Sequence, residues 1–98
     1  MLTISQCKDH EIYREIPEAT IAAINCYFSH HRPPGGFVHS VLANDLMGAV
    51  RHASESNMKA LHPICSYLHW EVPGRSLEVW GSYEAVNKWL AARPDVNE

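Results

Sequence analysis

Apolar residues recur every three to four positions in four stretches of this 98-residue chain, and this spacing predicts helices. The first predicted helix begins at Pro17, a favoured first-turn residue, and ends near His31, ahead of the Pro33-Pro34 break. Its apolar stripe is formed by Ile21, Ile24 and Phe28.

The second predicted helix spans 37–53 and carries two different stripes on a helical wheel. The broader apolar arc predicts the core face and consists of Val38, Leu42, Leu46, Ala49, Val50 and Ala53. The second stripe consists of Phe37, Val41, Asn44 and Gly48, flanked by Arg51, Asp45 and His52. The width of the first arc predicts a central helix. Because a solvated face rarely carries Phe, Val and Gly together, we expect the second stripe to contact another molecule.

A capping-rich Ser-Glu-Ser-Asn segment at 54–57 precedes a third predicted helix over 58–71. Pro63 conflicts with helix continuity, but the apolar spacing survives across it, so we expect one bent element. The apolar positions of this helix are Met58, Leu61, Ile64, Cys65, Leu68 and Val72. Ser82 predicts the N-cap of a fourth helix that ends near Arg93. Its buried stripe is Tyr83, Val86, Trp89 and Leu90.

The remaining segments show little regular pattern. We expect 1–15 to be irregular, 72–76 to be a turn, 77–80 to be extended at most, and 94–98 to be a frayed tail. The sequence therefore predicts a single all-α domain over 1–98, a compact bundle of about four helices with the helix at 37–53 in the centre.

Composition and charge limit the classes of partner that the chain can bind. Hydrophobic residues make up 46% of the chain, which is typical of a folded domain, and the formal net charge is −3. The eight Lys and Arg residues are scattered, so duplex nucleic acid lacks its usual electrostatic anchor. No apolar stretch approaches the roughly 20 residues that span a bilayer, and we expect a cytoplasmic protein without a membrane partner.

Cysteine and histidine spacing does not favour a metal or a catalytic centre. Cys7, Cys26 and Cys65 form no CxxC pair, so we expect them to be small core residues. His62 and His69 are seven residues apart, about 10.5 Å along a helix, and are typical of a solvated flank. No nucleophile–base pair is evident, and we therefore expect no metal, no cofactor and no enzyme activity.

The loop between the first two predicted helices has three interpretations. Arg32, Gly35 and Gly36 could bind a small anion beside a helix start. The same Pro-Pro-Gly-Gly run could simply turn the chain, or it could contact a protein.

Two further features leave alternatives open. Asn44 and Asp45 lower helix propensity at mid-helix, so either a hydrogen bond to a nearby loop or a contact with a dimer mate or ligand should compensate. Trp70, Trp80, Trp89 and Tyr67 are too many for so small a core. An exposed pair among them would anchor an interface, while Trp89 fits the core.

A resemblance rests on five short motifs that together extend from Ile16 to Leu90. The motifs are Ile16-Pro17-Glu18, Pro34-Gly35-Gly36-Phe37, Val41-Leu42-x-Asn44-Asp45-Leu46, Asn57-x-x-Ala60-Leu61 and Trp80-Gly81-Ser82 with Trp89-Leu90. This pattern resembles short accessory proteins of tailed bacteriophages and prophages. The resemblance implies a phage protein that acts in the bacterial host cytoplasm, and it implies no catalytic residues.

These observations lead to three functional hypotheses. The first is a non-enzymatic, homo-oligomeric binding protein that inhibits a host factor, in anti-defence or host takeover. The second is a sponge that sequesters a small nucleotide signal, and the third is a virion or regulatory component. The predicted contact surface comprises Arg32, Gly35, Gly36, Phe37, Val41, Asn44, Asp45 and Arg51.

Overall fold

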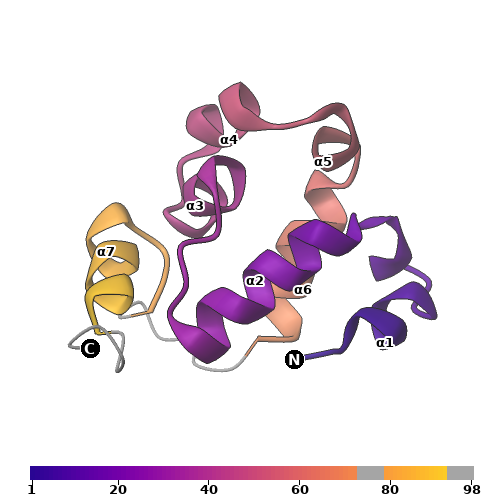
Figure 1. The fold of residues 1–98 in the computed structure, drawn as a ribbon. Helices are drawn as coiled ribbons and strands as arrows, with labels where there is room; N and C mark the ends of the chain where they lie inside the picture. Colours follow the sequence, from indigo (N-terminus) through magenta and orange to yellow (C-terminus); the bar gives the residue numbers. More distant parts are fainter. Residues whose placement is uncertain (73–78, 93–98) are drawn as a thin grey trace.

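The computed structural model describes residues 1–72 and 79–92 (Figure 1), and this part of the chain is all-α, as predicted. Within these two described ranges, seven α-helices and one 3-10 helix replace the expected four helices. They are α1 (Ile4–Lys8), η1 (Tyr13–Glu15), α2 (Glu18–His30), α3 (Gly36–Leu42), α4 (Leu46–His52), α5 (Glu55–Lys59), α6 (Leu61–Trp70) and α7 (Tyr83–Ala91). The count rises because two predicted helices are each divided and the N-terminal segment is itself helical.

The core lies where α2 crosses α6, with α7 at one side and α1 at the other (Figure 1). Side chains with less than 2% exposure come from most of these elements: Cys7, Ile21, Ile24, Tyr27, Leu42, Ile64, Tyr67, Leu68 and Val86. The predicted stripe of α2 is buried, and Pro17 is its N-cap rather than its first helical residue.

The expectation that 1–15 is irregular is wrong. Thr3 and Gln6 form a reciprocal capping box, in which the Thr3 hydroxyl accepts from the Gln6 N–H and the Gln6 side chain accepts from the Thr3 N–H. This box starts α1, whose Cys7 is fully buried, and Tyr13 of η1 is only 3% exposed. The N-terminal segment therefore belongs to the core.

The predicted helix over 37–53 is interrupted at Asn44. Asn44 adopts a left-handed conformation with φ of 64°, and its N–H donates to the carbonyl of Val41. The Asp45 N–H donates to the Ser40 carbonyl, which completes a Schellman motif at the end of α3. The Asp45 carboxylate then accepts from the Gly48 N–H at 2.9 Å and begins α4. The two residues that weaken a helix here end one helix and start the next.

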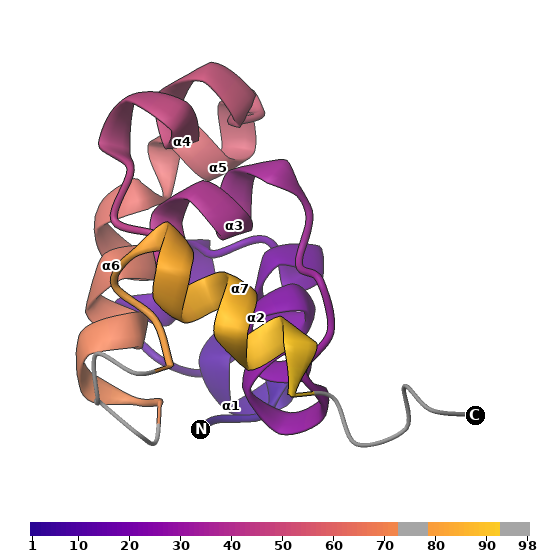
Figure 2. The ribbon, with the colours of Figure 1, turned by 90° about the vertical axis from the view of Figure 1, so that its left-hand side faces the viewer.

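The interruption changes which side chains face inward. Leu46 and Val50, predicted to be core residues, are 58% and 46% exposed. Phe37 and Gly48, predicted to lie on an outward stripe, are buried. A single helical wheel cannot describe both halves of the 37–53 segment, because α4 folds back over α3 at one end of the molecule (Figures 1 and 2).

The third predicted helix is likewise two helices. Ser54, in the predicted capping segment, caps α5 by accepting from the Asn57 N–H, so 55–57 are helical rather than a break. This helix stops at Ala60, and α6 begins at Leu61. Pro63 thereby occupies the first turn of α6, where its missing N–H leaves no bond unmade. The expectation of one bent element is wrong.

The helix α7 begins at its predicted N-cap, where the Ser82 hydroxyl accepts from the Ala85 N–H. It packs against the end of α2 through Trp89, whose indole N–H donates to the Tyr27 carbonyl at 2.7 Å. The His31 ring stacks on Trp89 with centroids 3.7 Å apart, while His31 itself takes a left-handed conformation that ends α2. These contacts confirm the core position of Trp89.

Buried tyrosine hydroxyls tie distant segments together. The Tyr27 hydroxyl donates to the Val79 carbonyl, and the Tyr67 hydroxyl donates to the Asn25 side chain. The Tyr13 hydroxyl donates to the Glu71 carboxylate, and burial together with this contact raises the pKa of Tyr13 to about 12. Each buried hydroxyl is therefore paired, as a buried polar group must be.

Several predictions involve residues beyond the described ranges. Most of the predicted turn at 72–76, Leu77 and Glu78 of the extended segment, and the tail at 94–98 are among these. Val79 and Trp80, the rest of the extended segment, lie in a turn rather than in a strand. Within the described ranges, none of the helices has the length and apolar character needed to traverse a bilayer.

The left-handed turn predicts different outcomes for two substitutions at Asn44. Asn44→Ala should lower the free energy of unfolding by about 1–2 kcal/mol, because a Cβ-bearing residue without a local polar group disfavours this conformation, whereas Asn44→Gly should preserve it. Chemical denaturation measures both. Asn87→Ala, on the exposed face of α7, is the matched control and should be neutral or slightly stabilising. Stabilisation by Asn44→Ala would show instead that the helix continues through this position.

Candidate functional site

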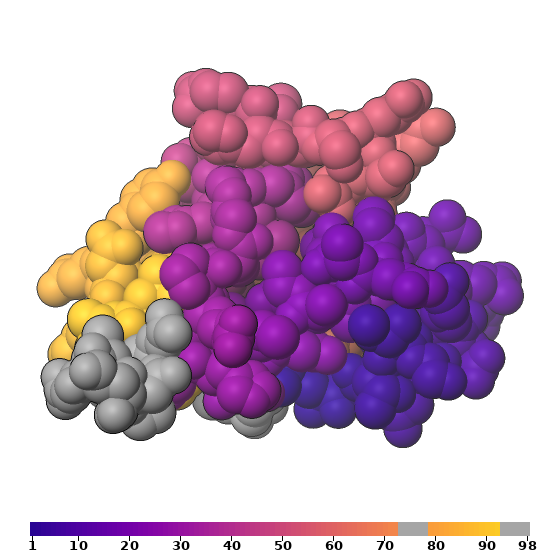
Figure 3. Space-filling view, in the orientation of Figure 1, coloured from indigo at the N-terminus to yellow at the C-terminus, as the bar shows by residue number. Residues whose placement is uncertain are grey.

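The helix α4 exposes an unusual number of large apolar side chains. Leu46, Met47 and Val50 are 58%, 63% and 46% exposed, and we call these three residues the α4 face. The opposite side of the same helix is buried through Gly48 and Ala49. The helix is thus amphipathic with its smallest residues inward, because Gly48 lies close against α3. Figure 3 shows α4 and α5 projecting together at one end of the surface.

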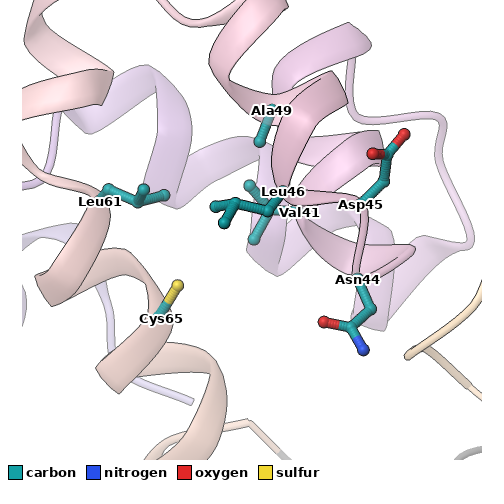
Figure 4. A pocket seen from close by; sticks show the side chains of 7 residues that line it. All are labelled: Val41, Asn44, Asp45, Leu46, Ala49, Leu61 and Cys65. Carbon is teal, nitrogen blue, oxygen red and sulfur yellow. The ribbon is translucent and has the colours of Figure 1, made fainter.

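A small hollow adjoins the α4 face (Figure 4). It has a volume of about 80 Å³ and separates α3 and α4 from α6. Its lining is apolar apart from the edge formed by the α3–α4 turn, and consists of Val41, Asn44, Asp45, Leu46, Ala49, Leu61 and Cys65. Leu46 and Leu61 point toward each other across it, and Asn44 points away. An aliphatic group from outside could enter this space.

The thiols of Cys7 and Cys65 are not activated nucleophiles. Desolvation raises the pKa of Cys65, whose sulfur faces the apolar hollow although the residue as a whole is exposed. Burial raises the pKa of Cys7, and the nearby Glu71 charge raises it further. Both thiols are therefore protonated at neutral pH. Cys7 is a core residue, as predicted, Cys26 is half-buried, and for Cys65 that prediction is wrong.

A larger hollow of about 370 Å³ lies on another side of α3, and we call it the His39–His52 hollow. Four segments meet there: the loop before α3, α3 itself, the end of α4 and the start of α7. Its lining consists of Pro33, Gly35, Gly36, His39, Ser40, His52 and Tyr83. A Cβ on Gly36 would lie 3.4 Å from the His52 ring, so glycine permits the close approach of α4.

Asp45 connects the helix interruption to α7. The Tyr83 hydroxyl donates to Asp45 Oδ2 at 2.5 Å, while the Gly48 N–H donates to Oδ1. The Tyr83 hydrogen bond, followed by the Gly48 hydrogen bond, lowers the pKa of Asp45. Two residues before Tyr83, the Gly81 N–H donates to the Leu42 carbonyl at 2.7 Å. The sequence left open whether Asp45 bonds within its own chain or contacts a dimer mate or ligand. These hydrogen bonds are within the chain.

The eight residues of the predicted contact surface do not form one face. Gly35 and Gly36 line the His39–His52 hollow, and Arg32 lies exposed in the loop before them. Val41, Asn44 and Asp45 border the smaller hollow, Arg51 is exposed on α4, and Phe37 is buried at 7% exposure. The helix interruption separates the residues that a continuous helix would have aligned.

Sequence reasoning missed the α4 face and the two histidines that define the larger hollow. The Asn44-Asp45 pair was the available signal, because Asn is a common left-handed cap and Asp a common N-cap. Interpreted as a stop followed by a start, it would have turned Leu46 and Val50 outward.

The remaining predictions concern the exposure of the tryptophans, of Tyr67 and of two histidines. Tyr67 is fully buried, Trp80 and Trp89 are half-buried, and Trp70 is 70% exposed at the end of α6. His62 and His69 are exposed, as expected of a solvated flank. In the part of the chain that the structure describes, no three His, Cys, Asp or Glu side chains gather as a metal site would require.

Comparison of the chain with protein-family models, with curated proteins and with solved structures finds no match. The functional argument therefore depends on the site itself.

The packing beneath α4 predicts that Gly48→Ala is destabilising, although Ala is the better helix former. Its Cβ would lie 2.9 Å from both Asp45 Cγ and Ser40 Oγ, and such overpacking costs about 1–3 kcal/mol. Denaturation of Gly48→Ala, Asp45→Ala and the double variant measures this effect. The double variant should lose less than the sum of the single variants, because Asp45→Ala removes one of the clashing groups. Strict additivity would contradict the contact.

The lowered pKa of Asp45 predicts an acid-dependent contribution to stability. Since the folded-state pKa lies below the unfolded value of about 3.9, the stabilisation is present above that pH and is lost as the pH falls through the folded-state pKa. Asp45→Asn should therefore lower the melting temperature at neutral pH, and the difference from wild type should close in acid. Asp9→Asn, at the exposed C-cap residue of α1, is the control and should show no such closing gap. A gap independent of pH would rule out the charged contact.

Proposed function

We propose that this chain is a non-enzymatic binding protein that inhibits another protein by docking on it through the α4 face. The observation that supports this function is the exposure of Leu46, Met47 and Val50 together on one short helix. Exposed apolar residues that cluster, unlike those scattered singly, are typical of interaction sites.

The surroundings of the α4 face resemble the centre and rim of a protein interface. The adjoining hollow is lined by Val41, Ala49 and Leu61 and can receive one aliphatic side chain of a partner. Arg51 follows on the same helix and is exposed, which supplies a polar group at the rim. An apolar centre with a polar rim concentrates the binding energy in a few side chains.

The chemistry of the described side chains favours binding over catalysis. The thiols of Cys7 and Cys65 are held protonated, so neither is an activated nucleophile. The Asp45 carboxylate is engaged by Tyr83 and Gly48, and it serves to join α4 to α7. These three groups are therefore not arranged as a nucleophile and its base.

The resemblance to short accessory proteins of tailed phages supplies the biological setting of the proposal. The partner would be a host protein in the bacterial cytoplasm, and binding would serve anti-defence or host takeover. The α4 face is limited to one helix of seven residues, whereas a stable interface buries roughly 800 Å² on each partner. The face is therefore the centre of a larger contact, and self-association through it is the competing outcome.

Capture from bacterial lysate tests the proposal. Tagged wild-type protein should retain one host protein in a stoichiometric amount, and Met47→Lys/Val50→Lys should lose it without a change in melting temperature, because both side chains are exposed. Ile12→Lys is a matched control, since Ile12 is 45% exposed, close to the 46% of Val50, and it lies away from α4.

The outcomes separate the alternatives. Capture that survives in the double lysine variant would exclude the α4 face as the docking site. A loss that Ile12→Lys reproduces would show that the interaction is nonspecific. Light scattering on the same proteins reports self-association, and a wild-type dimer that becomes monomeric in the double variant would assign the face to a second copy of the chain.

A further inference from the structure

The His39–His52 hollow exists because the helix is interrupted at Asn44. In one continuous helix Gly36 and His52 would be sixteen residues apart, about 24 Å along the axis. In this fold α4 turns back, and the ring of His52 lies against Gly36 at 3.4 Å from the position of a Cβ. The turn brings both ends of the 36–52 segment to one place and adds Tyr83 from α7.

The size of this hollow fits a small molecule rather than an ion. Its volume of about 370 Å³ falls within the range of small-molecule sites, roughly 300–1,000 Å³. It opens on a different side of α3 from the smaller hollow beside the α4 face, and the two share no lining residue. It can therefore act independently of a protein partner.

The polar side chains of the hollow favour a negatively charged ligand. His39 and His52 supply two imidazoles, and Ser40 supplies a hydroxyl that can donate. The described lining residues include no carboxylate. The Asp45 carboxylate, which contacts Tyr83 of this lining, accepts from the Tyr83 hydroxyl, and its other charged neighbours are Arg51 and His52.

The apolar part of the hollow favours a flat ring. The hydroxyl of Tyr83 is held by Asp45, and its ring centroid lies 5.7 Å from that of His39. Tyr83 is 46% exposed, so its anchored ring is available to a ligand, and the Pro33 ring provides a second apolar wall. Nucleic-acid bases stack on such aromatic surfaces with little sequence preference.

We propose that the His39–His52 hollow binds a small aromatic phosphate of mononucleotide size. The two imidazoles hold the phosphate, and Tyr83 supports the base. Histidine gains its proton as the pH falls below neutral, so binding strengthens in mild acid. Asp45 remains ionised in mild acid and stays bonded to the Tyr83 hydroxyl, so the position of the Tyr83 ring does not change.

Titration with 3′,5′-cyclic AMP tests the proposal, because its phosphodiester keeps one charge over the pH range used. Backbone amide shifts followed by NMR, with EDTA present to exclude a bridging metal, should change at 35–40, His52 and Tyr83. The affinity should be about tenfold higher near pH 6 than near pH 8, as charge-assisted hydrogen bonds form. Adenosine, which lacks the phosphate, should bind weakly and without this dependence on pH.

Variants make the test specific. His39→Gln and His52→Gln should each lower the affinity near pH 6 by about tenfold and flatten the pH dependence, since each removes one charged donor. His62→Gln, at an exposed imidazole on α6, is the matched control and should change neither. Amide shifts that occur elsewhere, binding unaffected by the two histidine variants, or no shifts at millimolar cyclic AMP would each overturn the proposal. None of these results depends on the α4 face.

Discussion

The structure depends on a single left-handed residue at the middle of its predicted central helix. Asn44 ends α3 with the two hydrogen bonds of a Schellman motif, and Asp45 begins α4 at once. Because the chain reverses there, Gly48 and Ala49 pack inward and Leu46, Met47 and Val50 face solvent. The same reversal brings His52 against Gly36. Both candidate sites are thus consequences of one backbone conformation, although they lie on different sides of α3.

The helix α7 holds this arrangement in place from the opposite end of the sequence. It is attached to the α3–α4 turn by the bond between Tyr83 and Asp45 and by the bond between Gly81 and Leu42. It is attached to α2 by Trp89, which donates to the Tyr27 carbonyl and stacks on His31. The helix interruption at Asn44 and the position of α7 are therefore coupled, and a ligand that contacts Tyr83 would affect both.

Sequence patterns predicted those parts of the fold that local chemistry decides. The all-α class, the limits of α2, the Ser82 cap and the core position of Trp89 all follow from spacing, caps and breakers. Periodicity failed where two short helices in succession imitated one long helix, over 37–53 and again across Ala60. The candidate site could not be predicted for the same reason, since a wheel drawn through Asn44 assigns Leu46 to the core and Phe37 to the surface. Tertiary packing decides whether that segment forms one long helix or two short ones.

The tyrosine hydroxyls have a consequence for how the molecule reaches its native state. Tyr67 bonds residue 25, Tyr27 bonds residue 79 and Tyr13 bonds residue 71, so their partners lie 42 to 58 positions away along the chain. Helical proteins usually assemble rapidly because most of their contacts are local. Here the polar groups of the interior find partners only after long loops have closed, which costs chain entropy early in assembly. Slow closure is thus the kinetic counterpart of an interior in which tyrosine hydroxyls bond segments that are distant along the chain.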